Sequence, residues 1–290
     1  MKYFRTIEKI ISPPAPHMVG DGFRVHHFLP MDTDETLQRM SPFFMLDYGS
    51  KFEFTPSDHP RGVGVHPHRG FETVTIAFKG KIAHHDSACN HGIIGEGDIQ
   101  WMTAGSGVLH KEYHEEEFSK KGGLFQMVQL WINLPAKFKM ISPRYQEITA
   151  DKKGIVQLDH GVVEVIAGEF NGVKGPAQTF SPIELYVIKL EAGGVFEIEI
   201  PEEYNVSALM IEGIAISDGQ SIPQDHFALF NNNGNKIKIE AKEKATILFM
   251  AGHPLHEPIA AYGPFLMNTE QEIRQAFEDF RNGKFGYLAE

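Results

Sequence analysis

Hydrophobic and polar positions alternate along the chain in short stretches, which predicts a protein built mainly of β-strands. The clearest stretches are residues 74–78, 99–102, 127–132, 185–190, 195–200, 237–239 and 246–250. Turn sequences that contain glycine separate them, as at 79–80, 95–98 and 231–234. Because strands recur about every ten residues, the pattern favours sandwiches or barrels over β-α-β units.

One helix is predicted near the end of the sequence. Thr269, followed three residues later by Glu272, has the spacing of a capping box. An apolar stripe at helical spacing follows, made of Ile273, Ala276, Phe277 and Phe280. Gly283 suits the left-handed residue that ends a helix. We expect this helix to cover a sheet.

The 290 residues amount to about two domains. Residues 134–154 interrupt the strand pattern with prolines and charges, as linkers do. We therefore predict two domains, at residues 1–140 and 141–290. Each half has a glycine turn, a strand pair and a strand that starts at an aspartate, Asp98 or Asp225, which indicates a diverged internal duplication.

Composition excludes several classes of protein. No stretch approaches the roughly 18 apolar residues of a membrane span. The formal charge of -11 repels a phosphate backbone, so we expect no direct binding to nucleic acid. Residues 1–9 lack the pattern of a secretory signal, and the single cysteine, Cys89, cannot form an internal disulfide. These features favour the cytoplasm.

The candidate chemistry starts at His66 and His68. In a strand, side chains two apart share a face, so both imidazoles can point into a barrel and reach one metal ion. Pro67 then faces away and suits an edge or bulged strand. With 15 histidines in 290 residues, a His-x-His pair arises by chance about once, so the pair alone carries little weight.

A second element supplies that weight. His110 and Glu112 also share a strand face, about forty residues later, and enough turns intervene for hairpins to return the chain beside the first strand. Gly105 and Gly107 let the backbone turn tightly just before them. Three imidazoles and one carboxylate suit a divalent first-row metal and leave coordination positions open.

Other candidate residues are weaker. Glu72 has the strand parity of His66 and His68, so it is either a fifth ligand or an acceptor that orients an imidazole, unless a bulge at Gly70 turns it off that face. Surface or hydrogen-bonded roles are expected for His26, His27, His84, His85, His91, His114, His253 and His256. Core packing is expected for Trp101, Met102, Phe43 and Phe44.

Several segments together resemble the pirin family of bicupins. They are 66–75 (HPHRGFETVT), 85–87 (HDS), 97–105 (GDIQWMTAG), His110 with Glu112, 134–137 (LPAK) and 262–269 (YGPFLMNT). The resemblance covers essentially the whole chain. It implies an all-β fold of two cupin-type barrels with a short C-terminal helix, and one iron, Fe(II), held by His66, His68, His110 and Glu112.

Some residues depart from general cupin patterns. Gly80 lies one residue beyond the usual spacing after Glu72, and Gly105 stands where many cupins have proline; pirins share both departures. Ser106 stands where pirins often carry arginine, which leaves no charge there at the mouth of the site. In the second half, Ile237 and Ile239 occupy the positions that correspond to the second ligand pair, so we expect that barrel to be metal-free.

The resemblance implies two classes of function. The first is an iron-dependent dioxygenase that opens flavonol-type substrates, as a quercetin 2,3-dioxygenase does. There the 3-hydroxyl of a small aromatic substrate binds iron, and Glu112 or another carboxylate beside the metal takes the proton. The enolate then reacts with dioxygen, and carbon monoxide leaves. The second is a metal-sensing interaction protein without turnover. A weaker third is an isomerase or lyase that uses the metal only as a Lewis acid.

Overall fold

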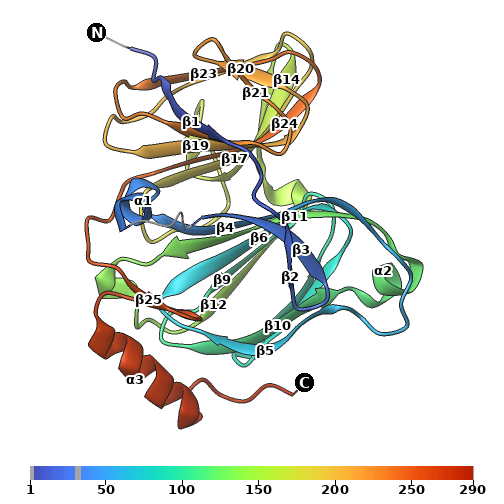
Figure 1. Cartoon of the computed structure of the whole chain (residues 1–290), viewed down its shortest axis with the longest axis vertical. Coiled ribbons are helices and arrows are strands. Elements are labelled where there is room, and N and C mark those ends of the chain that lie inside the picture. Colours follow the sequence, from blue (N-terminus) through green and yellow to red (C-terminus); the bar gives the residue numbers. More distant parts are fainter. Residues whose placement is uncertain (1–2, 30–33, 290) are drawn as a thin grey trace. The chain divides into compact units, whose positions relative to one another are not determined.

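The structure is a computed structural model that describes residues 3–29 and 34–289 (Figure 1). The described chain forms two compact units. A larger unit contains residues 15–29, 34–37, 43–150 and 256–289, and a smaller unit contains residues 3–14, 38–42 and 151–255. No helix within these residues has the length and apolar character needed to cross a membrane.

Two antiparallel sheets form the larger unit. One has the strand order β12-β9-β6-β11-β4-β3-β2, and the other has the order β5-β10-β7-β8. The strands are β2 (His17–Val19), β3 (Phe23–Leu29), β4 (Phe43–Phe54), β5 (Gly62–His68), β6 (Phe71–Lys79), β7 (Ile82–Asp86), β8 (His91–Ile94), β9 (Ile99–Thr103), β10 (Val108–His114), β11 (Gly123–Asn133) and β12 (Arg144–Ile148).

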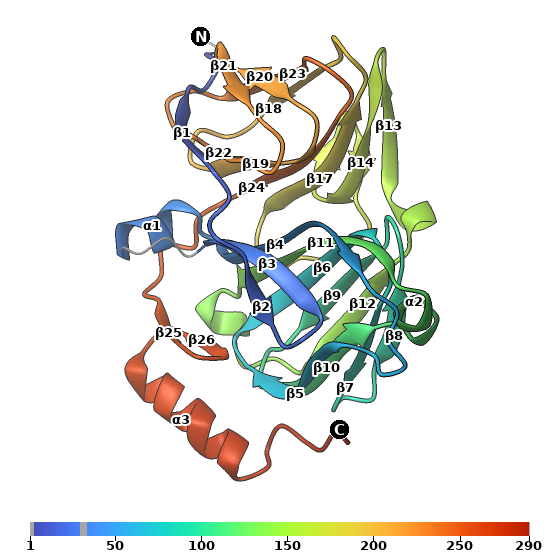
Figure 2. The same ribbon diagram turned by 45° about the vertical axis from the view of Figure 1, so that its right-hand side comes forward.

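Short helices and one further hairpin complete this unit. The helices are α2 (Glu116–Lys121), η1 (Ala136–Phe138) and α3 (Glu270–Arg281), and the hairpin is β25 (Ala260–Tyr262) with β26 (Phe265–Met267). Two further segments, α1 (Asp34–Arg39) and η2 (Ala150–Lys152), lie where the chain passes from this unit to the smaller one. The predicted helix is confirmed as α3: Thr269 and Glu272 form the capping box, and Gly283 follows the helix with a φ of 72°. Figure 2 shows α3 beside the hairpin, against which Ile273 and Ala276 pack.

The smaller unit repeats the arrangement of two sheets. The first has the order β1-β22-β19-β24-β17-β14-β13, the second has the order β18-β23-β20-β21, and β15 pairs with β16. The strands are β1 (Ile7–Ile11), β13 (Gly154–Leu158), β14 (Gly161–Ala167), β15 (Glu169–Phe170), β16 (Val173–Lys174), β17 (Ile183–Leu190), β18 (Val195–Glu199), β19 (Asn205–Glu212), β20 (Ala215–Ser217), β21 (Gln220–Ile222), β22 (Phe227–Phe230), β23 (Lys236–Ala241) and β24 (Ala245–Gly252).

Apolar side chains fill the interior of the smaller unit. Ile237 and Ile239 on β23 are fully buried in an apolar cluster with Phe196, Phe230 and Phe249. Apolar side chains offer no atom to a cation, so the positions that correspond to His110 and Glu112 are filled by packing.

Strand pairing, rather than order in the sequence, determines which residues belong to each unit. The division after residue 140 differs from the observed units in four places, one of which is residues 38–42 in the smaller unit. β1 pairs with β22 and so belongs to the smaller unit, whereas β12, inside the expected linker, pairs with β9 in the larger one. Residues 256–289 also belong to the larger unit. Backbone donors and acceptors are satisfied by distant partners, which local composition does not reveal.

The strand predictions themselves are confirmed. Every stretch named from the alternation of hydrophobic and polar residues lies in an observed strand or overlaps one, and the observed strands extend further by one to four residues at some ends. The core prediction is confirmed as well: Trp101, Met102 and Phe43 are almost completely buried, and Phe44 is 9% exposed.

Candidate metal centre

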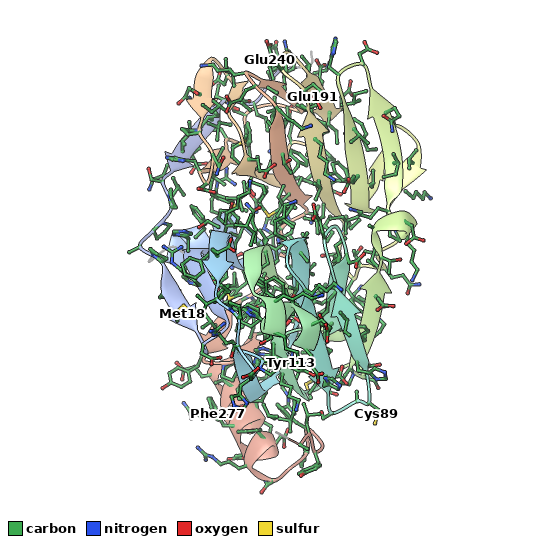
Figure 3. The ribbon with its side chains drawn as sticks, turned by 90° about the vertical axis from the view of Figure 1, so that its right-hand side faces the viewer. Met18, Cys89, Tyr113, Glu191, Glu240 and Phe277 are labelled. Carbon is green, nitrogen blue, oxygen red and sulfur yellow. The ribbon has the colours of Figure 1, made fainter. Side chains whose placement is uncertain are left out.

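The two predicted ligand segments lie side by side in one sheet. β5 and β10 lie side by side in Figure 1 and pair antiparallel. In this pairing His110 is opposite His66 and Val108 is opposite His68. Tyr113, labelled in Figure 3, marks β10 one residue after Glu112. β5 is the outer strand of this sheet, as Pro67 predicts. The hairpins between residues 68 and 108 therefore return the chain beside its first ligand strand.

Three imidazoles converge at this pair of strands. One nitrogen from each of His66, His68 and His110 lies within 4.8 Å of the others. The ring centroids are 4.2 Å apart for His66 and His110, 4.7 Å for His68 and His110, and 4.8 Å for His66 and His68. His110 is fully buried and His68 is 5% exposed. This spacing suits one metal ion held by three nitrogens.

Glu112 lies next to His110 but follows an irregularity in the strand. The register between β10 and β5 shifts between His110 and Glu112, so Glu112 faces Val63 instead of Gly64. A carboxylate oxygen of Glu112 lies within 4.8 Å of one nitrogen of His110 and one nitrogen of His84. It does not lie that close to both His66 and His68. His110 is therefore the residue that joins the three imidazoles to the carboxylate.

The hydrogen bonds of the histidines leave nitrogens free for a metal. His66 Nδ1 donates to Gly64 O at 2.8 Å, and His68 Nδ1 lies 3.3 Å from Pro264 O. A carbonyl only accepts, so the proton is on Nδ1 and the lone pair is on Nε2. Both nitrogens of His110 are buried without a hydrogen-bond partner in the structure. An orphaned imidazole of this kind fits a ligand for an ion.

Burial also keeps two of these rings neutral. The pKa of His68 lies well below its usual range because of burial and the neighbouring His66. The pKa of His110 is lowered in the same way by burial and by the surrounding imidazoles. Because only the neutral ring has a lone pair to donate, the site holds these side chains in the form that binds metal.

Three side chains fix the carboxylate of Glu112. Its Oε1 accepts hydrogen bonds from Gln100 Nε2 at 2.8 Å and from Thr75 Oγ1 at 3.1 Å. Its Oε2 accepts from Gln129 Nε2 at 2.7 Å. A carboxylate offers about four lone-pair sites, so these donors leave about one for a metal or a proton. Partners of this kind orient a ligand and tune its affinity.

His84 forms a second, overlapping group with His110 and Glu112. It is fully buried, and both of its nitrogens have partners: Nε2 lies 3.3 Å from Asp86 Oδ2, and Nδ1 lies 3.2 Å from Gln100 Nε2. The carboxylate accepts and the amide nitrogen donates, so the ring has no lone pair left. His84 therefore supports Gln100, and the group with His66 and His68 is better suited to metal.

Glu72 belongs to neither group of candidate ligands among the described residues. Gly70 turns the chain between β5 and β6 with a φ of 89°, so Glu72 leaves the face that carries His66 and His68. The Glu72 carboxyl is buried and accepts a hydrogen bond from Thr103 Oγ1 at 2.6 Å. Burial raises its pKa to about 7, against the effect of that hydrogen bond and of Arg144.

A buried lysine holds the turn after His68 in place. Lys139 Nζ donates to Gly70 O, to Asn133 Oδ1 and to Leu266 O at 2.6 to 2.8 Å. A Cβ on Gly70 would lie 2.1 Å from Leu266 O, so only glycine fits this contact. The strand that carries His66 and His68 is thus anchored to residues near the C-terminal end.

A cavity of about 380 Å³ opens beside the candidate ligands. Its wall includes His66, His68 and Glu112, with Asp47 and Gln129 as the other side chains that hydrogen-bond strongly. The remainder is mostly apolar: Val19, Phe23, Val25, Met45, Val63, Met127, Trp131, Gly263 and Pro264. Trp131 stacks on Phe71 with 4.1 Å between ring centroids and lies edge-on to His68 at 5.1 Å. The cavity suits a flat aromatic ligand.

The supporting residues were not foreseen from the sequence. Thr75, Gln100 and Gln129 are each surrounded by apolar residues in their strands, and such polar side chains on a buried strand are the available signal. The other histidines largely follow the expectation of hydrogen-bonded roles, as His27 with Asp47, His85 with Tyr113 and His114 with the Gly22 carbonyl show.

Comparisons with known proteins agree over nearly the whole chain. The family model described as Pirin matches residues 22–132, and the model of the pirin C-terminal cupin domain matches residues 185–286. A Pseudomonas aeruginosa protein, named as a candidate quercetin 2,3-dioxygenase, is 43% identical over 93% of this chain and 94% of its own. Human Pirin is 36% identical over 87% of this chain and 85% of its own.

A solved structure is similar in fold and sequence. The crystal structure of quercetin 2,3-dioxygenase from Acinetobacter baumannii superposes with a TM-score of 0.93 at 42% sequence identity. It covers 99% of this chain and 100% of its own.

Proposed function

This chain belongs to the pirin family, with two cupin domains, and on that premise we propose that it is a metal-dependent dioxygenase that opens flavonol-type substrates. We propose Fe(II) as the metal, with His66, His68, His110 and Glu112 as its ligands. The relatives named for quercetin 2,3-dioxygenase activity support this choice of reaction.

One observation carries the proposal: two of the three converging imidazoles border a cavity that Trp131 also lines. His66 and His68 form part of the wall that Trp131 also lines, and Glu112 lies on the same wall. A flat substrate that packs beside the indole would therefore meet the proposed ligands His66, His68 and Glu112 in the same cavity. Proximity of this kind favours reaction between two bound partners.

A divalent first-row metal held here would supply Lewis acidity, which lowers the pKa of a substrate hydroxyl, and open positions for two reactants. The chain's own residues do the rest. The neutral imidazoles supply nitrogen ligands, and the donors from Thr75, Gln100 and Gln129 keep Glu112 fixed. With about one lone-pair site left, Glu112 serves as ligand or as proton acceptor at any one moment.

The reaction is balanced by one molecule of dioxygen. Both oxygen atoms enter the ring-opened product, and one ring carbon leaves as carbon monoxide. The apolar wall formed by residues such as Val25, Met127 and Trp131 excludes water from the deprotonated substrate, which protects it from simple reprotonation.

The test starts with metal analysis of protein purified without added metal. Oxygen uptake and carbon monoxide release are then measured with flavonols. We expect one metal per chain and equal consumption of oxygen and release of carbon monoxide. His66→Ala and His110→Ala should lose metal and turnover together, whereas His160→Ala, on an exposed turn of the smaller unit, should keep both.

Two results would contradict the proposal. Turnover retained by the His66→Ala and His110→Ala variants would remove the metal centre from the reaction. Stoichiometric metal with no oxygen uptake across a set of flavonols would favour the metal-sensing interaction protein instead. Activity in the absence of oxygen would favour an isomerase or lyase.

A further inference from the structure

A carboxylate that the proposed reaction does not use lies on the wall of the same cavity. Asp47, on β4, lines it together with His66, His68 and Glu112. Asp47 and Glu112 are the acidic side chains of that wall among the residues that the structure describes. Most of the surrounding wall is apolar, including Met45 and Met127. A charged group in such a place calls for partners.

One of its oxygens has a partner in the protein. His27 Nδ1 lies 2.6 Å from Asp47 Oδ1. The imidazole is 39% exposed and the carboxylate side chain is 11% exposed, so the ring reaches Asp47 from the solvent side. Oδ2 accepts no hydrogen bond from the described part of the chain. A flat ligand in the cavity would cover this oxygen and remove its access to water, so the oxygen would then need a donor carried by the ligand.

The strand register places Asp47 in line with the groups that hold Glu112. Asp47 faces His27 across β3 and β4, and it faces Gln129 across β4 and β11. Residues opposite each other in antiparallel strands share one face of the sheet. Gln129 donates to Glu112 Oε2, so one amide side chain separates the two carboxylates along the wall. A ligand in the cavity can meet both ends of this row.

The aromatic wall sets the shape of that ligand. Trp131 faces Met45 across the same two strands, two residues from the Gln129 and Asp47 pair. It stacks on Phe71, with Phe44 nearly parallel at 6.4 Å between centroids. A flat ring lying along Trp131 would extend from the imidazoles toward Asp47. The ring's edge there would need an O–H or N–H group to satisfy Oδ2.

We propose that Asp47, held by His27, is a specificity-determining acceptor for a second hydroxyl of a flat aromatic ligand, at a distance from the imidazoles. The site then selects polyphenols that have two separated hydroxyls over analogues that have only the one near the metal. As far as substrate turnover is concerned, this inference rests on the proposed function; as a statement about binding, it stands by itself.

Binding measured without oxygen separates the binding role of Asp47 from the proposed turnover. Protein as purified is titrated without oxygen with quercetin and with 3-hydroxyflavone, which lacks the other hydroxyls. Tryptophan fluorescence reports occupancy, because Trp131, one of the two tryptophans, lines the cavity. Trp131→Phe confirms the source of the signal. We expect wild-type protein to bind quercetin about tenfold more tightly, which is the worth of one hydrogen bond to a charged acceptor.

Asp47→Leu should lose that preference while its affinity for 3-hydroxyflavone stays within about twofold, since the lost bond concerns only the second hydroxyl. Asp47→Asn, which keeps an oxygen but no charge, should lose part of it. His27→Gln should also lose part, because it frees the carboxylate to turn. Asp58→Asn, an exposed acidic residue, serves as the control.

Each outcome decides the inference. A wild-type preference that survives in Asp47→Leu and Asp47→Asn overturns it, and so does a wild-type protein that binds both flavonols equally or binds neither. Loss of the preference in the Asp47 variants supports it, even where oxygen uptake is absent. In that case the dioxygenase proposal fails and the binding role of Asp47 remains.

Discussion

Arg69 Nη1 lies 2.9 Å from Asp279 Oδ2, which joins the residue after His68 to the C-terminal helix α3. Both side chains are buried, and the guanidinium also donates to Ser106 O and lies over the ring of Phe285 at 4.7 Å. One cation thus connects β5, the turn before β10 and the end of the chain. The candidate metal centre depends on contacts from residues far outside its own two strands.

Breaking this ion pair should destabilise the protein. Asp279→Ala leaves the Arg69 charge buried without its partner, so we expect the free energy of unfolding to fall by about 3 kcal/mol. Urea unfolding of the metal-free protein measures it. Glu270→Ala removes an exposed pair with Arg274 on the same helix and should cost less than about 0.5 kcal/mol. Equal losses in the two variants would contradict a buried, structural role for Asp279.

The donors to Glu112 should control metal affinity. Gln129→Met removes the hydrogen bond to Oε2, and we expect the affinity for metal to fall by about tenfold to a hundredfold. Competition with a chelator of known affinity measures this. Gln157→Met, at an exposed position of β13, is the matched control. Unchanged affinity in Gln129→Met would indicate that Glu112 does not bind the metal.

Glu72 should make stability depend on pH. Burial raises the pKa of Glu72 to about 7 in the folded protein, against 4.5 for an ordinary glutamate, so between these pH values the folded state holds a proton that the unfolded state has lost. Stability is therefore present at acidic pH and is lost as the pH rises from about 4.5 through 7, by about 3 kcal/mol in total. Urea unfolding of metal-free protein across this range should show the loss in wild type and not in Glu72→Gln. The same slope in both would assign it to another group.

Lys139 should be needed for the turn after His68. Lys139→Met leaves Gly70 O, Asn133 Oδ1 and Leu266 O without their shared donor, and we expect a loss of about 3 kcal/mol. Thermal unfolding measures the change. Lys137→Met, at an exposed position two residues earlier, should stay within about 0.5 kcal/mol. A Lys139 variant as stable as the Lys137 variant would refute this anchoring role.

Local patterns predicted what depends on a single strand. The parity of His66 with His68, and of His110 with Glu112, follows from the geometry of an extended chain, and the structure pairs these strands directly. Thr269 and Glu272 likewise predict the start of α3 because a capping box involves only neighbours. Such features depend only on residues that are close together in the sequence.

Features that depend on residues far apart in the sequence could not be predicted from the sequence alone. Gln129 is recognisable as a support for Glu112 only once β11 is placed against β6, and Asp47 only once β4 lies beside it. The irregularity between His110 and Glu112 has no mark of its own in the sequence, because it arises from the fit of β10 to β5. His84 was expected to have an ordinary hydrogen-bonded role, and its link to the site runs through Gln100.

The interleaving of the two units bears on how the protein can be dissected. A fragment that stops at residue 140 would carry both ligand strands, yet it would lack β12, the Leu266 carbonyl and Asp279, and it would keep β1 without β22. We expect such a fragment to aggregate or to be degraded, because unpaired strand edges and uncovered hydrocarbon would face solvent. Deletion mapping by sequence halves would therefore misattribute a loss of folding to a loss of chemistry, whereas point substitutions in the whole chain avoid that error.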